Sequence, residues 1–158
     1  MGLQDALTRL DAIVQAVVPA VRPDLPFNVV DEARTKDGPG GVRGRTRTCS
    51  LIVDEPPVDD GQAGATNLRR RAGLHLRVRY DAAQIGSRRE LDLMVGRDVN
   101  DLIDAVAFTP GDWQAGSTGI DSIEIPGPPT TEDVSPDNRG RVAVVLTLPF
   151  TMLYHEGA

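Results

Sequence analysis

The segment that most constrains the fold of this chain runs from Gly140 to Tyr154, with the sequence GRVAVVLTLPFTMLY. Apolar residues occupy nearly every position, including Val144, Val145 and Leu146 in a row, whereas a strand with one face in water alternates apolar and polar residues. We therefore expect a strand that is covered on both faces. In a small domain a helix can cover one face, and a neighbouring subunit is a natural candidate for the other, so the segment indicates a protein that assembles.

Pro149 interrupts this segment. Because proline has no amide hydrogen to donate to a ladder, we expect the pairing to be interrupted or one-sided near Leu148 to Phe150. In the predicted arrangement Gly140–Leu148 belongs to the subunit's own sheet and the strand bends at the proline. Phe150–Tyr154 then continues as a second segment at the sheet edge, where a neighbour can pair with it.

Helical periodicity predicts two main helices, over about 3–18 and 87–108. The first has Leu3, Leu7 and Leu10 on one face, and the second opens with the capping box Ser87-Arg-Arg-Glu90. Residues 27–33, 46–53, 68–80 and 120–125 read as further strands, and Pro- and Gly-rich composition predicts long loops at about 34–46, 54–67 and 126–139. This order predicts an α+β fold in which helices pack on a mostly antiparallel sheet.

The length of 158 residues fits a single domain, 1–158, and the net charge of −6 argues against a dedicated nucleic-acid-binding protein. Cys49 is the single cysteine, so an intramolecular disulfide is excluded and a reducing compartment is expected. The N-terminus lacks a basic signal region and no apolar run reaches membrane-spanning length. We expect a soluble intracellular protein that does not contact a membrane.

Few residues of the chain indicate a catalytic site or a metal-binding site. His75 lies in an alternating strand and reads as a surface histidine, and no G-x-S-x-G motif accompanies it or His155. Cys49 lies among apolar neighbours and reads as a buried, inert thiol. The helical carboxylates Asp92, Asp98, Asp101 and Asp104 read as a solvated face in preference to a cation site. Gly38–Gly44 resembles a phosphate-binding loop but lacks its lysine and its helix. We expect no catalytic residue, no cofactor and no metal.

Charged blocks on the predicted loops and strand ends are the stronger signal. A basic block over 34–47 is followed by an acidic run from Asp54 to Asp60 and by the basic run Arg69-Arg-Arg71. Blocks of opposite sign can match a neighbour's surface, although solvated loops with internal pairing explain any single block equally well. The predicted oligomer or tube interface comprises Arg34, Lys36, Arg43, Arg45, Arg47, Asp59, Asp60, Arg69, Arg70, Phe150, Met152 and Tyr154.

The chain resembles the tail terminator (tail completion) proteins of long-tailed bacteriophages and prophages. The resemblance covers most of the chain and rests on the opening helix, the strand LHLRVRY at 74–80, the helix from Ser87 to Phe108, the strand at 120–125 and the closing strand. It implies a ring, commonly a hexamer, that caps the tail tube, stops its polymerisation and presents a surface to the head-completion or neck protein. Genomic DNA would pass through the lumen without sequence-specific binding. The location would be the head-proximal end of the virion tail, and the host cytoplasm during assembly.

Three other functions remain open at this stage. A head-to-tail connector and a tail-tube subunit share small size and ring assembly with tail terminators. A small ligand-binding or enzymatic domain should present a pocket with convergent polar groups, and the chain has few histidines and aromatic residues from which to build one.

Overall fold

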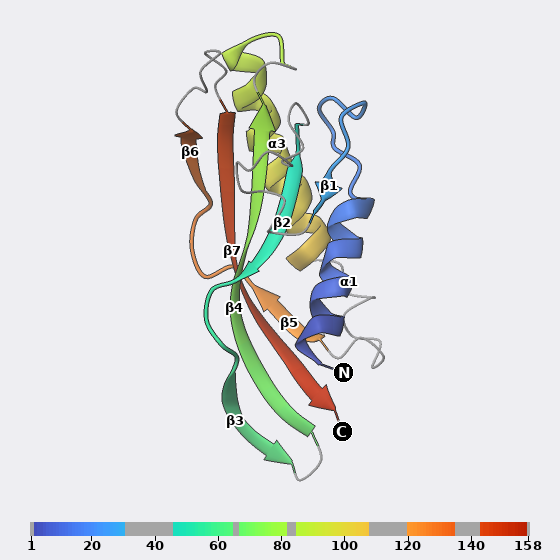
Figure 1. Cartoon of the computed structure of the whole chain (residues 1–158), viewed down its shortest axis with the longest axis vertical. Helices are drawn as coiled ribbons and strands as arrows, with labels where there is room; N and C mark the ends of the chain where they lie inside the picture. The colour runs from blue at the N-terminus through green and yellow to red at the C-terminus, as the bar shows by residue number, and fades with distance from the viewer. Residues whose placement is uncertain are drawn as a thin grey trace.

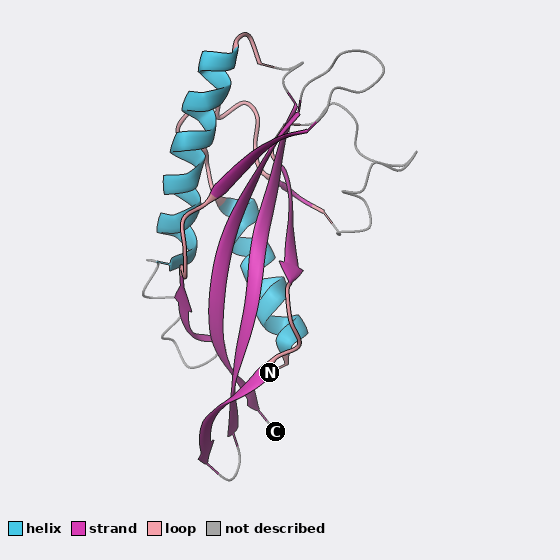
Figure 2. Cartoon of the chain, turned by 90° about the vertical axis from the view of Figure 1, so that its left-hand side faces the viewer, coloured by secondary structure: helices cyan, strands magenta, loops and turns pink. Residues whose placement is uncertain are grey.

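The computed structural model describes residues 2–30, 46–64, 67–81, 85–107, 120–134 and 143–157. Its elements are α1 (Leu3–Ala16), β1 (Asn28–Val29), β2 (Thr48–Val53), β3 (Val58–Gly64), β4 (Asn67–Asp81), α3 (Arg88–Ala107), β5 (Ile120–Glu124), β6 (Thr130–Val134) and β7 (Ala143–Gly157). Both helices pack on one face of a mostly antiparallel seven-stranded sheet, as Figures 1 and 2 show. The predicted α+β class is confirmed, and so are the two helices.

Local sequence explains where the helices lie. Ala6, Leu10 and Val14 of α1 are buried at the spacing of one helical face. At the start of α3, the Ser87 hydroxyl accepts a hydrogen bond from the Glu90 amide at 3.2 Å, as the capping box predicts. The Glu90 carboxylate reaches one residue further back than the usual box, to the Gly86 amide at 3.2 Å.

Two long strands form the centre of the sheet. β4 and β7 each span 15 residues and pair without a register shift from Asn67↔Gly157 to Asp81↔Ala143. On the outer side of β4, β2 pairs with Leu74–Arg79 and β3 pairs with Asn67–Arg71. On the outer side of β7, β5 pairs with Thr151–Tyr154 and β6 pairs with Ala143–Thr147. Each central strand is therefore flanked by an outer line of two shorter strands with a break between them.

Pro149 lies at the second of these breaks, and the predicted one-sided pairing near Leu148–Phe150 is confirmed. These residues pair with β4 on one side, while the described registers of β5 and β6 end before reaching them on the other. The prediction that Phe150–Tyr154 forms a separate segment at the sheet edge is wrong. β7 continues through the proline and lies between β4 and β5, because a missing amide donor does not disturb a ladder where no second strand needs it.

Two segments predicted as loops contain strands. β3 lies within the predicted loop 54–67, and β6 lies within the predicted loop 126–139. Their acidic, Gly- and Thr-containing sequences have weak strand propensity, and pairing with the long central strands outweighs it. Most of the third predicted loop, 34–46, lies outside the described residues.

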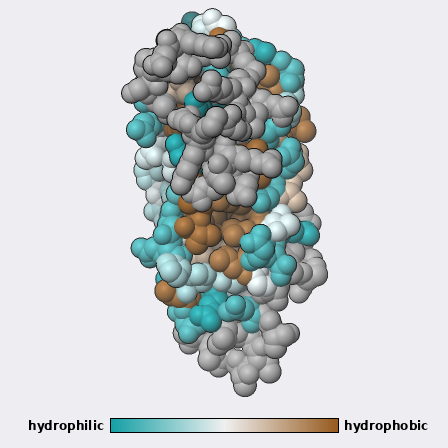
Figure 3. Space-filling model, in the orientation of Figure 1, coloured by the Kyte–Doolittle hydropathy of each residue, from teal (hydrophilic) through white to brown (hydrophobic). Residues whose placement is uncertain are grey.

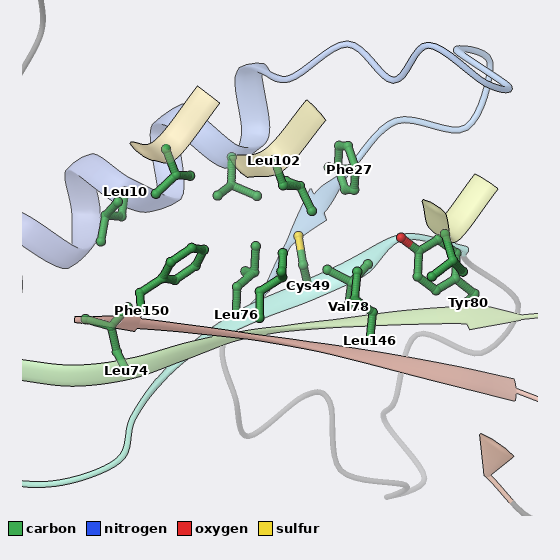
Figure 4. Packing of buried hydrophobic residues seen from close by; sticks show 14 of the residues in the cluster. Leu10, Phe27, Cys49, Leu74, Leu76, Val78, Tyr80, Leu102, Leu146 and Phe150 are labelled. Atoms are coloured by element: carbon green, nitrogen blue, oxygen red, sulfur yellow. The ribbon is translucent and has the colours of Figure 1, made fainter. Parts of the chain in front are cut away.

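The core lies between the helices and one face of the sheet. Alternate residues of β4 and β7, such as Leu76 and Phe150, point toward the helices, where Figure 4 shows Leu102 of α3 above Leu76 and Leu10 of α1 above Phe150. Cys49 is buried among them, as predicted. The helices cover one face of β7. On the other face, which no helix covers in the described part of the chain, Ala143, Val145 and Leu153 are also buried, so the expected burial of both faces occurs within this single chain.

Candidate interaction surfaces

A buried arginine joins the sheet to α3 and to the segment after α1. Arg47 immediately precedes β2 and has a backbone φ of 61°, in the left-handed region. Its Nε and Nη2 donate to Oδ2 and Oδ1 of Asp98 on α3, at 2.7 and 2.8 Å. Its remaining donors bind the backbone oxygens of Arg22, Leu25 and Val21 at 2.5 to 2.7 Å. All five guanidinium hydrogens therefore have partners within the chain.

Tyr80 completes this cluster by donating its hydroxyl to Asp98 Oδ2 at 2.8 Å. The Phe27 ring lies against the guanidinium, with 5.4 Å between the ring centroid and the Arg47 Cζ. Burial raises the pKa of Asp98, and the hydrogen bonds from Arg47 and Tyr80 oppose that increase. The arrangement holds α3, β2, β4 and the segment after α1 together, and it belongs to the architecture of the folded chain.

Two predictions are corrected by this cluster. The predicted interface with another subunit includes Arg47, but its side chain is fully buried and its donors bind groups of the same chain. The predicted solvated face of the second helix includes Asp98, but this residue too is fully buried. The signal was present in the sequence, since Asp98 lies seven residues after Leu91 and four before Leu102, on the apolar stripe of α3.

The ends of β3, β4 and β7 run past both helices and form a projecting arm, visible at the bottom of Figures 1 and 2. Arg70 of β4 lies in the middle of the arm. It forms ion pairs with Asp59 of β3 at 2.8 Å and with Glu156 of β7 at 2.9 Å. The two carboxylates are more exposed than the guanidinium. The arm therefore carries an alternating row of charges across three strands, of which Asp59 and Arg70 were predicted and Glu156 was not.

The face of the sheet away from the helices is rich in polar groups. Along β4, Arg69, Arg71, His75, Arg77 and Arg79 alternate with the buried residues and therefore point to this face. His75 Nδ1 contacts Asp54 Oδ1 at 2.5 Å, and the imidazole is partly exposed, in agreement with its reading as a surface histidine. Arg77 is exposed. In the part of the chain that the structure describes, His75 bonds to Asp54 on this face and no serine or cysteine hydrogen-bonds to the imidazole.

The remaining predicted interface residues divide into two groups. Phe150, Met152 and Tyr154 all lie on the core side of β7 and are buried, with at most 2% of each residue exposed, so they stabilise the subunit and are not available to a neighbour. Arg34, Lys36, Arg43 and Arg45 lie outside the described residues, and so does the side chain of Asp60. Arg69 belongs to β4 in the arm and is half-buried.

Within the described ranges, no group of three His, Cys, Asp or Glu side chains is arranged to hold a metal ion. None of the described helices is both long and apolar enough to cross a membrane. No family profile and no curated protein sequence matches the chain.

Proposed function

We propose that this protein is a structural component of a long-tailed bacteriophage or prophage, acting as the tail terminator. In this role it assembles as a ring on the end of the tail tube, stops tube polymerisation and offers a joining surface to the head. The proposal rests on the resemblance of the chain to tail terminators. It is supported by an interaction surface that a ring subunit needs and that a self-contained domain does not.

The observation that carries the proposal is the projecting arm. Strands β3, β4 and β7 extend the sheet beyond the helices that cover its core, and the exposed charges of Asp59 and Glu156 lie on this extension. Ordering such an extension costs conformational entropy without the hydrophobic gain of the core. Contact with a neighbouring subunit or with the tube would compensate for that cost.

Tail-tube assembly measures this function directly. Tube protein from the same phage is polymerised with and without this protein, and tube length is measured by electron microscopy while the mass of the isolated protein is measured by light scattering. The proposal expects added protein to shorten the tubes and to form a ring at one end. Unchanged tube length with no density at the tube end would reject it.

The same experiment separates the related functions. A tail-tube subunit would copolymerise along the tube, and a head-to-tail connector would bind heads and leave free tubes unchanged. Retention of the protein at tube ends as a stoichiometric ring distinguishes the terminator from both.

A further inference from the structure

The C-terminal half of β2 has an unpaired outer edge in the described part of the chain. β1 pairs with β2 only at Thr48 and Cys49, and within the described residues no strand pairs with the outer edge of Leu51–Val53. Cys49 is fully buried, whereas Leu51 and Val53 remain partly exposed on the same side of the strand. The edge therefore offers backbone hydrogen-bonding groups next to incompletely covered apolar side chains.

Helix α1 provides the opposite wall. Leu7, Asp11 and Gln15 follow one another at intervals of four residues and so lie on one stripe of the helix. The contacts of Gln15 show which way this stripe faces. Its side chain donates to the backbone oxygen of Phe27 at 2.7 Å and accepts from the backbone amide of Val29 at 2.9 Å, so the stripe faces the edge of the sheet at β1. Asp11 lies close enough to Cys49 to raise the pKa of its thiol. Leu7 and Asp11 thus border the free edge of β2.

The surface between these walls is apolar. Figure 3 shows apolar surface in the middle of this side of the molecule, in the area where Figure 1 draws the end of β2, β5 and the first half of α1. Leu51 is partly buried and packs against the edge of the hydrophobic core. Asp11 is the charged group beside it, and within the described residues its half-buried carboxylate has no hydrogen-bond or ion-pair partner.

We propose that this surface beside the free edge of β2, hereafter called the groove and defined by Leu7, Asp11, Leu51 and Val53, binds an extended peptide segment of a partner protein as an additional strand beside β2. Backbone pairing to Leu51–Val53 would hold the segment in place, apolar side chains would cover Leu7 and Leu51, and a lysine or arginine would pair with Asp11. Main-chain pairing supplies affinity in this mode of recognition, and alternate side chains supply specificity.

The charges favour a basic partner over a second copy of this chain. Besides Asp11, the exposed Asp54 and Glu55 follow directly after β2, and the chain carries a net charge of −6. The strand of this protein that alternates apolar and basic residues is β4, and β4 is already paired on both sides. Among the described strands no other one alternates in this way, and we therefore assign the segment with apolar residues around a lysine or arginine to another protein.

A short labelled peptide tests the proposal on the full chain. The probe has threonine at every second position and valine, lysine and valine, in that order, at the positions between. A matched peptide has glutamate in place of the lysine. Fluorescence anisotropy should show binding of the lysine peptide and at least about fivefold weaker binding of the glutamate peptide. Hydrogen exchange of the amides within Leu51–Val53 should slow when the lysine peptide binds.

Three variants locate the site. Asp11→Asn should weaken binding of the lysine peptide about fivefold and reduce its preference over the glutamate peptide. Leu51→Thr should weaken both peptides. Leu93→Thr is the matched control, because Leu93 is exposed on α3, and it should leave binding unchanged. Circular dichroism verifies that each variant is folded.

Absence of binding by the lysine peptide, or binding that neither Asp11→Asn nor Leu51→Thr weakens, overturns the proposal. Concentration-dependent self-association that Leu51→Thr abolishes also overturns it, by assigning the groove to a second copy. Since the peptide assay needs no tail tubes, its failure leaves the proposed terminator function intact.

Discussion

Arg47 and Asp98 form a bidentate ion pair in which both side chains are fully buried. Burying two charges is costly, and their attraction offsets that cost only where the remaining donors and acceptors are also satisfied. Here the backbone oxygens after α1 accept the other Arg47 hydrogens, and Tyr80 donates to Asp98. The pair therefore fixes one relative position of α3, β2 and the segment after α1, and its integrity should control the stability of the protein.

Removal of one member of this pair should destabilise the protein strongly. We expect Asp98→Ala to lower the free energy of unfolding by about 3–5 kcal/mol, because it leaves the buried Arg47 charge without its counter-ion. Urea denaturation followed by circular dichroism measures the change. The matched control is Asp92→Ala, which breaks an exposed ion pair to Arg88 and should cost less than about 1 kcal/mol. Equal losses for the two variants would show that Arg47 does not depend on Asp98.

Tyr80→Phe isolates the hydroxyl of the same cluster. The substitution keeps the buried ring and removes only the hydrogen bond to Asp98 at 2.8 Å. Loss of one hydrogen bond to a buried charged group should cost about 1.5–3 kcal/mol. In the presence of Asp98→Ala, Tyr80→Phe should lower the free energy of unfolding by less than it does alone, since the carboxylate that accepts the Tyr80 hydrogen bond is absent. Full additivity in this double-mutant cycle would contradict the described coupling.

A feature can be predicted from the sequence where a local pattern creates it, and cannot where contacts with distant residues create it. The buried strands and both helices have strong periodic patterns, and their bounds agree with the structure within a few residues. β3 and β6 have no such pattern, because edge strands with acidic residues owe their existence to the neighbouring β4 and β7. Spacing placed Asp98 on an apolar stripe, but only the fold brings Arg47 to it from 51 residues away in sequence.

Cys49 should make the stability of the protein sensitive to alkaline pH. Burial raises the pKa of its thiol to about 12 from an ordinary value of 9.0, so the unfolded chain loses this proton at lower pH than the folded chain. The thiol's contribution to stability is complete below pH 9 and is lost progressively between pH 9 and about 12. In this window the free energy of unfolding should fall by up to about 1.4 kcal/mol per pH unit more than in Cys49→Ala.

Urea denaturation at several alkaline pH values measures this difference as a slope, so the constant cost of the cavity in Cys49→Ala cancels. Tyr80 also has a pKa raised well above its ordinary value of 10.0, and it contributes a parallel decline to both proteins. Identical slopes for the wild type and Cys49→Ala would contradict the assignment to the thiol. In the native protein near pH 8, Cys49 should react with alkylating reagents far more slowly than in urea.

Charge reversal in the arm should separate assembly from folding. Arg70 pairs with Asp59 and Glu156, both of which are largely in contact with water, so Arg70→Glu should lower the free energy of unfolding by no more than about 1–2 kcal/mol. The substitution turns the alternating row of the arm into three adjacent negative charges, which a complementary neighbour would repel. We expect folded monomers that fail to cap tail tubes. Arg88→Glu, which changes an exposed arginine on α3 by the same charge, serves as the control and should retain capping. If both variants cap tubes normally, the arm is not the surface on which assembly depends, and the face of β4 that points away from α1 and α3, around Arg77, becomes the next surface to test.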